Sequence, residues 1–236
     1  MDGKFVAEYA VEVIQACSSC KHRSKTVPGI CLAFPDGIPF EILSGKNDHS
    51  TPVNGDHGIR YEAVVPKLDD RCGKHFTYRN FIECGETQAQ TGLPNLPKEI
   101  DSYKALHELA KNVLDLVVDK FGPEIELTYG FSSPELIKAI PGRIAPKLDQ
   151  HAAHEKNRLG NYICERPGAA CDFIVPGKDM REVAEWVYKN TEVDRVYFYD
   201  SENPIHVSFS NKRAHQFVEM LVGKNGRRTP RVVRFV

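Results

Sequence analysis

The sequence predicts an α+β protein, in which a domain with an antiparallel sheet and flanking helices follows a small N-terminal α+β region. Three observations lead to this prediction. A helix with apolar residues along one face covers about 102–121. Short apolar segments of strand length follow it as far as residue 210. The first 75 residues instead mix brief apolar runs with turn-rich segments, of which 44–58 is expected to be an exposed loop.

The composition is that of an ordinary globular protein. Of the 236 residues, 41% are hydrophobic and 27% charged, so the chain can bury a substantial core. A formal net charge of -1 gives the whole molecule no strong attraction to nucleic acid or to anionic membranes. Because the N-terminus lacks the basic start of a signal peptide and no apolar stretch is long enough to span a membrane, we expect a cytoplasmic protein without membrane contact. Seven scattered cysteines fit reduced thiols better than a disulfide framework.

By sequence the chain divides into three parts. Residues 1–75 form a small region of unknown role, 76–222 form the main domain, and 223–236 are a basic tail. The start of the main domain, 76–101, contains two prolines between polar residues and is expected to be an irregular joining segment. The tail carries five cations and no acidic residue, namely Lys224, Arg227, Arg228, Arg231 and Arg234.

Local signals place the elements of the main domain in order. Ser102 can cap the helix at 102–121, and Gly122 can end it. Ser133 is a suitable N-cap for a short helix at 134–140. The other predicted elements are strands at 125–130, 169–175, 195–200 and 205–210, a helix at 179–190, and a last helix near 211–222. The turn "SENP" predicts that the last two strands form a hairpin.

The apolar strand "AACDFIV" carries a carboxylate, Asp172, which would be costly to bury without a partner. The strand "PIHVSFS" likewise places His206 in apolar surroundings. Two interpretations stay open: a hydrogen-bonded Asp–His pair without a metal, or two ligands of a metal site. A catalytic zinc site has three protein ligands and an open position, and His151 and His154 are the nearest candidates for the third ligand.

The order of these segments resembles the zinc D-Ala-D-Ala carboxypeptidase and hedgehog-type peptidase superfamily. The chain reads "IELTYGFSSPELIKAI", "DQH", "GAACDF" and "PIHVSFS". Members of the superfamily carry S-G-Y-R-S-x-x-x-N, then S-x-H-x-x-G-x-A-x-D-F, then a W-x-H-V-S-like strand. Their zinc is held by the His and Asp of the second motif and the His of the third. The resemblance covers roughly residues 76–222 and implies this fold and zinc-dependent cleavage of a peptide or amide bond.

Carried over motif by motif, the resemblance implies that His151, Asp172 and His206 bind zinc. The connection between His151 and the "GAACDF" segment is longer than in the family, which an inserted loop would explain. A register without an insertion would instead make Glu165 the first ligand. The "QH" context and the ligand type favour His151.

Two departures from the family pattern concern catalysis and substrate binding. Ser132 occupies the position of the family arginine that stabilises negative charge in the transition state, so Arg143, Arg158 or Arg166 would have to supply that charge. His154 is a further candidate for substrate contact or an ordinary loop histidine.

The second departure concerns the general base, which the family places three to six residues before the last histidine. Glu202 is the preferred candidate for this proton acceptor and Asp200 is the substitute. In this scheme zinc lowers the pKa of its water, the carboxylate takes the proton, and the hydroxide attacks an amide carbonyl.

A rival hypothesis of another class is a non-catalytic metal-binding module whose basic tail contacts nucleic acid or a protein, for example in phage or genome-defence biology. A second feature left open is "CSSC", which with Cys31 and Cys72 could form a structural zinc site. A matching second half-site is missing, so these thiols are interpreted as small core residues. The oligomeric state and the natural substrate do not follow from the sequence.

Overall fold

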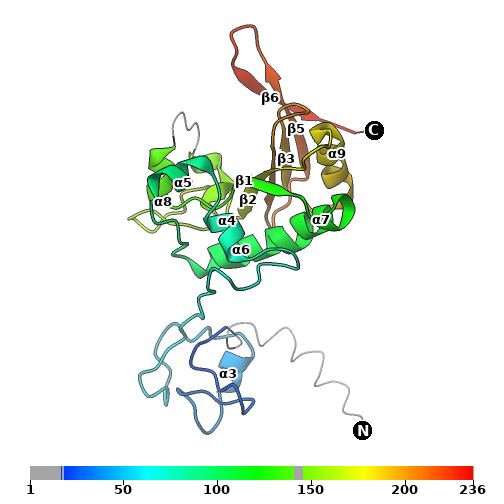
Figure 1. The fold of residues 1–236 in the computed structure, drawn as a ribbon. Coiled ribbons are helices and arrows are strands. Elements are labelled where there is room, and N and C mark those ends of the chain that lie inside the picture. The colour runs from blue at the N-terminus through cyan, green and yellow to red at the C-terminus, as the bar shows by residue number, and fades with distance from the viewer. Residues whose placement is uncertain (1–16, 18, 141–145, 236) are drawn as a thin grey trace. The chain divides into compact units, whose positions relative to one another are not determined.

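The computed structural model describes Cys17, 19–140 and 146–235 (Figure 1). The chain separates into two compact units, Met1–Val65 and Pro66–Val236. The second unit begins before residue 76 because Cys72 and Phe76 are buried in its core.

The second unit is built on one six-stranded sheet with the order β1-β2-β4-β3-β5-β6. Its strands are β1 (Glu126–Tyr129), β2 (Ala169–Ile174), β3 (Arg195–Phe198), β4 (Ile205–Phe209), β5 (Gln216–Val222) and β6 (Arg228–Val233). The sheet is mixed and not antiparallel as expected, because β3 and β5 run parallel whereas the other neighbours are antiparallel.

Helices surround this sheet. They are α4 (Tyr78–Ile82), α5 (Glu86–Thr91), α6 (Ile100–Leu109), a π-helical turn (Ala110–Leu114), α7 (Asp115–Phe121), α8 (Pro134–Ala139), two single 3₁₀ turns (Pro146–Leu148 and Gln150–Ala152) and α9 (Met180–Asn190). Helix α6 packs on β2 and β4, and α9 packs on β3 and β5 (Figure 1).

The core explains which face of the sheet is free for polar residues. Alternate strand residues point to opposite faces. Cys171 and Phe173 of β2 and Val207 of β4 are fully buried in one cluster with the apolar residues of α6 and α7. Asp172 and His206 therefore lie on the other face of the sheet.

Several predicted elements are confirmed. The long helix is continuous through α6, the π turn and α7, and ends at Gly122, although it begins at Ile100 and not at Ser102. Ser133 caps α8, since its hydroxyl accepts a hydrogen bond from the amide of Leu136. The strand–turn–strand at 195–210 is the antiparallel pair β3–β4, and the apolar face of α9 is buried.

Two predicted elements are wrong. The helix expected at 211–222 is the strand β5, which lies between β3 and β6; a short apolar run does not distinguish a buried strand from a buried helix. The segment 76–101, expected to be irregular, contains α4 and α5. In α4, Phe81 and Ile82 are buried and hold the helix against α6.

In the first unit the described residues include one four-residue helix, α3 (Phe40–Leu43), and no strand, so the strands expected there are not found among these residues. Single β-bridges join Cys20 to Ala63 and Arg23 to Cys31. Its core is small and consists of Ala33, Phe34, Ile38 and Ile42.

The basic tail is not separate from the domain, because 228–233 form strand β6 on the edge of the sheet. Over the described ranges, no helix combines the length and the apolar character needed to traverse a bilayer.

Candidate metal centre

Two neighbouring strands place an aspartate and a histidine side by side. In the antiparallel register of β2 and β4, Asp172 is directly opposite His206. Directly paired residues project their side chains from the same face of a sheet. The third residue, His151, comes from the 3₁₀ turn Gln150–Ala152, which packs against β2.

The ligand atoms of these three residues converge. His206 Nδ1 lies 2.8 Å from Asp172 Oδ1, and His151 Nε2 lies 3.2 Å from the same oxygen. The two imidazole nitrogens are 3.1 Å apart. Among the described residues, this is the group of three whose candidate metal ligands all lie within 4.8 Å of one another.

The surroundings of His151 fix its tautomer. Its Nδ1 is 2.7 Å from the carbonyl oxygen of Gly130, so Nδ1 carries the proton and donates it. Nε2 is the ring nitrogen that faces Asp172 and His206, and in the neutral imidazole it is the nitrogen available to a metal. A metal-binding histidine usually donates its second ring N–H to a backbone carbonyl or a carboxylate in this way.

Gly130 has no room for a side chain. A Cβ at this position would lie 2.3 Å from the carbonyl oxygen of Phe81 and 2.8 Å from Cys84 Sγ. The absence of a side chain therefore lets the backbone carbonyl of residue 130 approach α4 and reach His151.

Aromatic rings cover both histidines. The ring centroid of Tyr129, at the end of β1, lies 4.1 Å from that of His151. Tyr197, paired with His206 across β3 and β4, packs edge-on against His206 at 5.2 Å. Side-chain exposure is 4% for His151, 13% for His206 and 26% for Asp172, so solvent reaches the group from the side of the carboxylate.

The electrostatics of the group favour a charged carboxylate. Burial by itself raises the pKa of Asp172, but the facing His151 and His206 outweigh burial and hold the pKa well below its usual range. Burial, together with the charge of Asp172, raises the pKa of the Cys84 thiol to about 12, so Cys84 stays protonated beside the group at neutral pH.

The donor set fits a divalent cation such as zinc. Zinc binds imidazole and carboxylate at about 2.0–2.2 Å, which puts the ligand atoms of a tetrahedral site roughly 3.3–3.6 Å apart. The distances of 2.8–3.2 Å among the three atoms require only a slight expansion. Two imidazoles and one carboxylate leave a fourth position open.

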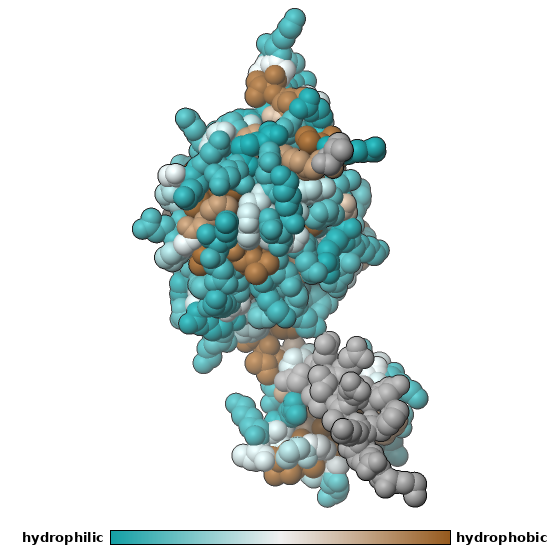
Figure 2. All heavy atoms as spheres, turned by 90° about the vertical axis from the view of Figure 1, so that its right-hand side faces the viewer, coloured by the Kyte–Doolittle hydropathy of each residue, from teal (hydrophilic) through white to brown (hydrophobic). Residues whose placement is uncertain are grey.

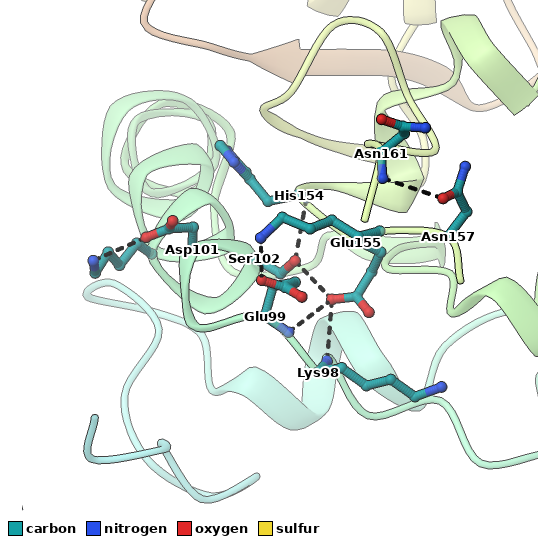
Figure 3. Close-up of polar contacts among 10 residues, drawn as sticks. Lys98, Glu99, Asp101, Ser102, His154, Glu155, Asn157 and Asn161 are labelled. Carbon is teal, nitrogen blue, oxygen red and sulfur yellow. Dashed lines mark hydrogen bonds and ion pairs between the residues drawn. The ribbon is translucent and has the colours of Figure 1, made fainter. Parts of the chain in front are cut away.

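The loop after His151 is tied to the start of α6 (Figure 3). The carboxylate of Glu155, which is 1% exposed, accepts hydrogen bonds from the amides of Lys98 and Glu99 and from the hydroxyl of Ser102. The same hydroxyl accepts a hydrogen bond from the amide of His154. A buried carboxylate at a helix N-terminus satisfies amides that have no partner within the helix, so this contact fixes the loop.

Other predicted residues lie apart from the three ligands. His154 and Arg166 line a pocket of about 440 Å³ beside α6 and the end of β4. Arg158 is exposed on the loop between them. Glu165 also lines the pocket and forms an ion pair with Lys147 at 3.0 Å. The structure therefore places His151, and not Glu165, beside Asp172 and His206.

The two candidate general bases lie in the β3–β4 turn. Asp200 is occupied within the turn: its carboxylate accepts hydrogen bonds from the amides of Glu202 and Asn203 and from the Asn203 side chain. Arg228 of β6 lies 3.4 Å from the same carboxylate. Glu202 is exposed. Neither carboxylate belongs to the converged group of three.

Ser132 supports His151 and is fully buried. Its amide donates to the carbonyl of His151 at 2.9 Å, and its hydroxyl donates to the phenol of Tyr129 at 2.5 Å. The sequence interpretation missed Tyr129, Gly130 and Tyr197 as neighbours of the ligands. Tyr129 and Gly130 stand directly before the "FSS" segment in the sequence, but their contacts with His151 depend on packing between distant parts of the chain.

Comparison of the chain with family models, with curated proteins and with solved structures gave no match.

Proposed function

We propose that the protein is a zinc-dependent hydrolase that cleaves a peptide or amide bond. The observation that carries the proposal is the convergence of His151 Nε2, Asp172 Oδ1 and His206 Nδ1 on one point, with the His151 tautomer set by Gly130. The order of the motifs in the sequence, which resembles the zinc carboxypeptidase and hedgehog-type superfamily, supports the same reaction class.

The roles of the residues follow from their positions. His151, Asp172 and His206 hold the ion, and the partly exposed Asp172 marks the side on which substrate approaches. When bound, zinc supplies Lewis acidity that polarises a carbonyl and lowers the pKa of a water molecule to about 7. Glu202, which is exposed in the β3–β4 turn, is the proposed acceptor of the proton.

His154 and Arg166 are expected from the sequence to contact substrate, but they line a pocket beside α6 that lies apart from the three ligands. This pocket also carries as many acidic as basic side chains. The pocket is therefore given no part in the proposed reaction.

The first test is metal content. Wild-type protein purified without added metal should hold zinc, and the variants His151→Ala, Asp172→Ala and His206→Ala should each lose one equivalent. Glu165→Ala is the matched control, since Glu165 lies outside the group, and it should keep the full content. Wild-type levels in all three ligand variants, measured by elemental analysis, would refute the site.

The second test is activity. Metal-loaded wild type should hydrolyse at least one member of a panel of peptides and amides. Glu202→Gln should lower kcat by roughly 10²–10⁴-fold while zinc content is unchanged. If Asp200→Asn shows the larger loss, Asp200 is the base; if the wild type cleaves nothing, the hydrolase proposal fails.

A specific observation also favours the non-catalytic alternative. The β5–β6 ribbon projects from the rest of the sheet (Figure 1). Besides its cations it exposes the apolar residues Leu221, Val222 and Val232. Figure 2 shows apolar side chains gathered near this ribbon. Two of its arginines already have acidic partners, Arg228 with Asp200 and Arg231 with Glu219. Nucleic-acid binding that weakens steeply with salt and is lost in Lys224→Ala/Arg227→Ala would support this role.

A further inference from the structure

We infer that the first unit holds a second metal ion, a structural zinc bound by Cys17, Cys20, Cys31 and His49. This site is separate from the group on β2 and β4, and it does not depend on the proposed hydrolase function.

The cysteines come together through two backbone contacts. In the C-x-x-C segment, the amide of Cys20 donates to the carbonyl of Cys17 at 3.2 Å, and the amide of Arg23 donates to the carbonyl of Cys20 at 3.3 Å. The bridge between Arg23 and Cys31 then brings the third cysteine beside this turn. All three thiols and His49 line one cavity of about 20 Å³. A space of this size accommodates a single small species.

The three cysteines are free thiols and partly buried. Three thiolates in one cavity repel one another unless a cation lies between them. Zinc is the expected cation, since thiolate and imidazole are its preferred ligands at structural sites.

His49 is suited to be the fourth ligand. It is 6% exposed, and its ring packs 5.2 Å from that of Phe34. Nε2 is buried without a hydrogen bond but lies 3.5 Å from the carboxylate of Asp56. A carboxylate facing one ring nitrogen while the other nitrogen binds the metal is the usual arrangement around zinc. These four ligand atoms do not all lie within 4.8 Å of one another, so the proposal requires the side chains to close around the ion.

The small core of this unit gives a reason for a metal. Among the described residues of this unit, four buried apolar residues and one four-residue helix offer little compensation for ordering the chain. Small domains with such cores are commonly stabilised by a structural metal or by disulfides.

The test uses the full chain. Zinc content should be two equivalents in wild type and one in Cys20→Ser. The variant His206→Ala removes the other metal site, so its remaining zinc can be exchanged for Co(II) and observed alone. The Co(II) protein should show thiolate-to-metal charge-transfer absorption. Adding Cys31→Ser or His49→Ala to this variant should weaken or shift that absorption. Cys72→Ala is the matched control, because Cys72 lies in the core of the other unit, and it should leave this absorption unchanged. Failure of the hydrolase proposal would not alter this absorption.

A second measurement covers the case in which a cysteine variant does not fold. In wild type, alkylation mapped by mass spectrometry should leave Cys17, Cys20 and Cys31 protected until a chelator is added. Absence of the charge-transfer absorption, alkylation that a chelator does not change, or a disulfide among the three cysteines in freshly purified protein would each overturn the proposal. An unchanged spectrum in His49→Ala would overturn the assignment of the fourth ligand.

Discussion

At the scale of single residues, the candidate metal centre depends as much on supporting groups as on the ligands. Gly130 fixes the His151 ring through a carbonyl, and Glu155 fixes the following loop through three hydrogen bonds. Neither residue is a metal ligand or a catalytic group, so a search for functional motifs would not detect either of them. Both can be tested by substitution.

Gly130→Ala should weaken metal binding. The added Cβ would lie 2.3 Å from the Phe81 carbonyl, so the backbone must shift and the bond to His151 Nδ1 is disturbed. Loss of such a supporting contact typically lowers metal affinity about 10–100-fold. Competition with a chromophoric chelator measures the change. Gly160→Ala is the control: the positive φ of 79° strains the alanine, but the added Cβ meets nothing within 4 Å and the residue lies outside the ligand group, so metal affinity should stay at the wild-type value.

Glu155→Ala should destabilise the second unit by about 1–3 kcal/mol, because two amides and the Ser102 hydroxyl lose their buried acceptor. Chemical denaturation gives the difference in the free energy of unfolding. Glu165→Ala removes an exposed carboxylate and should change stability by less than about 0.5 kcal/mol. Equal effects of the two substitutions would contradict the role given to Glu155.

At the scale of elements, the strand β5 connects three parts of the second unit. It pairs with β3 and with β6, and its Glu219 contacts Arg181 of α9 at 2.5 Å and Arg231 of β6. The hydrogen bond with Arg231, followed by that with Arg181, lowers the pKa of Glu219 below its usual value. A helix at this position could not have joined the sheet on both sides.

The Glu219 contacts predict a pH-dependent stability. A carboxyl with a lowered folded pKa contributes stability above its unfolded pKa of about 4.3 and loses it as the pH falls through the folded pKa. Glu219→Gln should therefore cost on the order of 1 kcal/mol at pH 7, and the difference from wild type should shrink below about pH 4. Urea denaturation as a function of pH measures this. Glu192→Gln, whose carboxylate pairs with Arg213 at an exposed site, is the control and should show a smaller difference at pH 7.

At the scale of the whole molecule, the two units have separate cores. With the partly buried side chains packed on them, the larger cluster begins at Leu68, and the smaller one contains no described residue beyond Ile59. Each unit also has its own candidate metal site. Loss of one metal should therefore leave the other unit folded.

A fragment of residues 66–236 should fold and bind one zinc ion through His151, Asp172 and His206, because the whole sheet and its core lie within it. Its denaturation midpoint should match that of the second transition of the full chain. A fragment that stays unfolded, or that folds without binding metal, would show that the first unit is required.

The sequence by itself determined the elements with strong local signals and the identity of the three convergent residues. The long helix, the Ser133 cap, the apolar face of α9 and the β3–β4 hairpin all follow from periodicity and turn residues, whereas the π turn in the long helix was not predicted. Asp172 and His206 were detectable because a charged or polar side chain interrupts an apolar strand. The ordered motifs then favoured His151 over Glu165.

Only the tertiary structure decided the remaining features, because they depend on contacts between distant residues. The run at 216–222 becomes a strand since β3 offers it a parallel partner. Cys31 meets the C-x-x-C turn through a bridge that no spacing rule predicts, and Gly130 reaches His151 across 21 positions of sequence. Periodicity reports which face of an element is buried, whereas the partner that buries it is set by the packing of the whole chain.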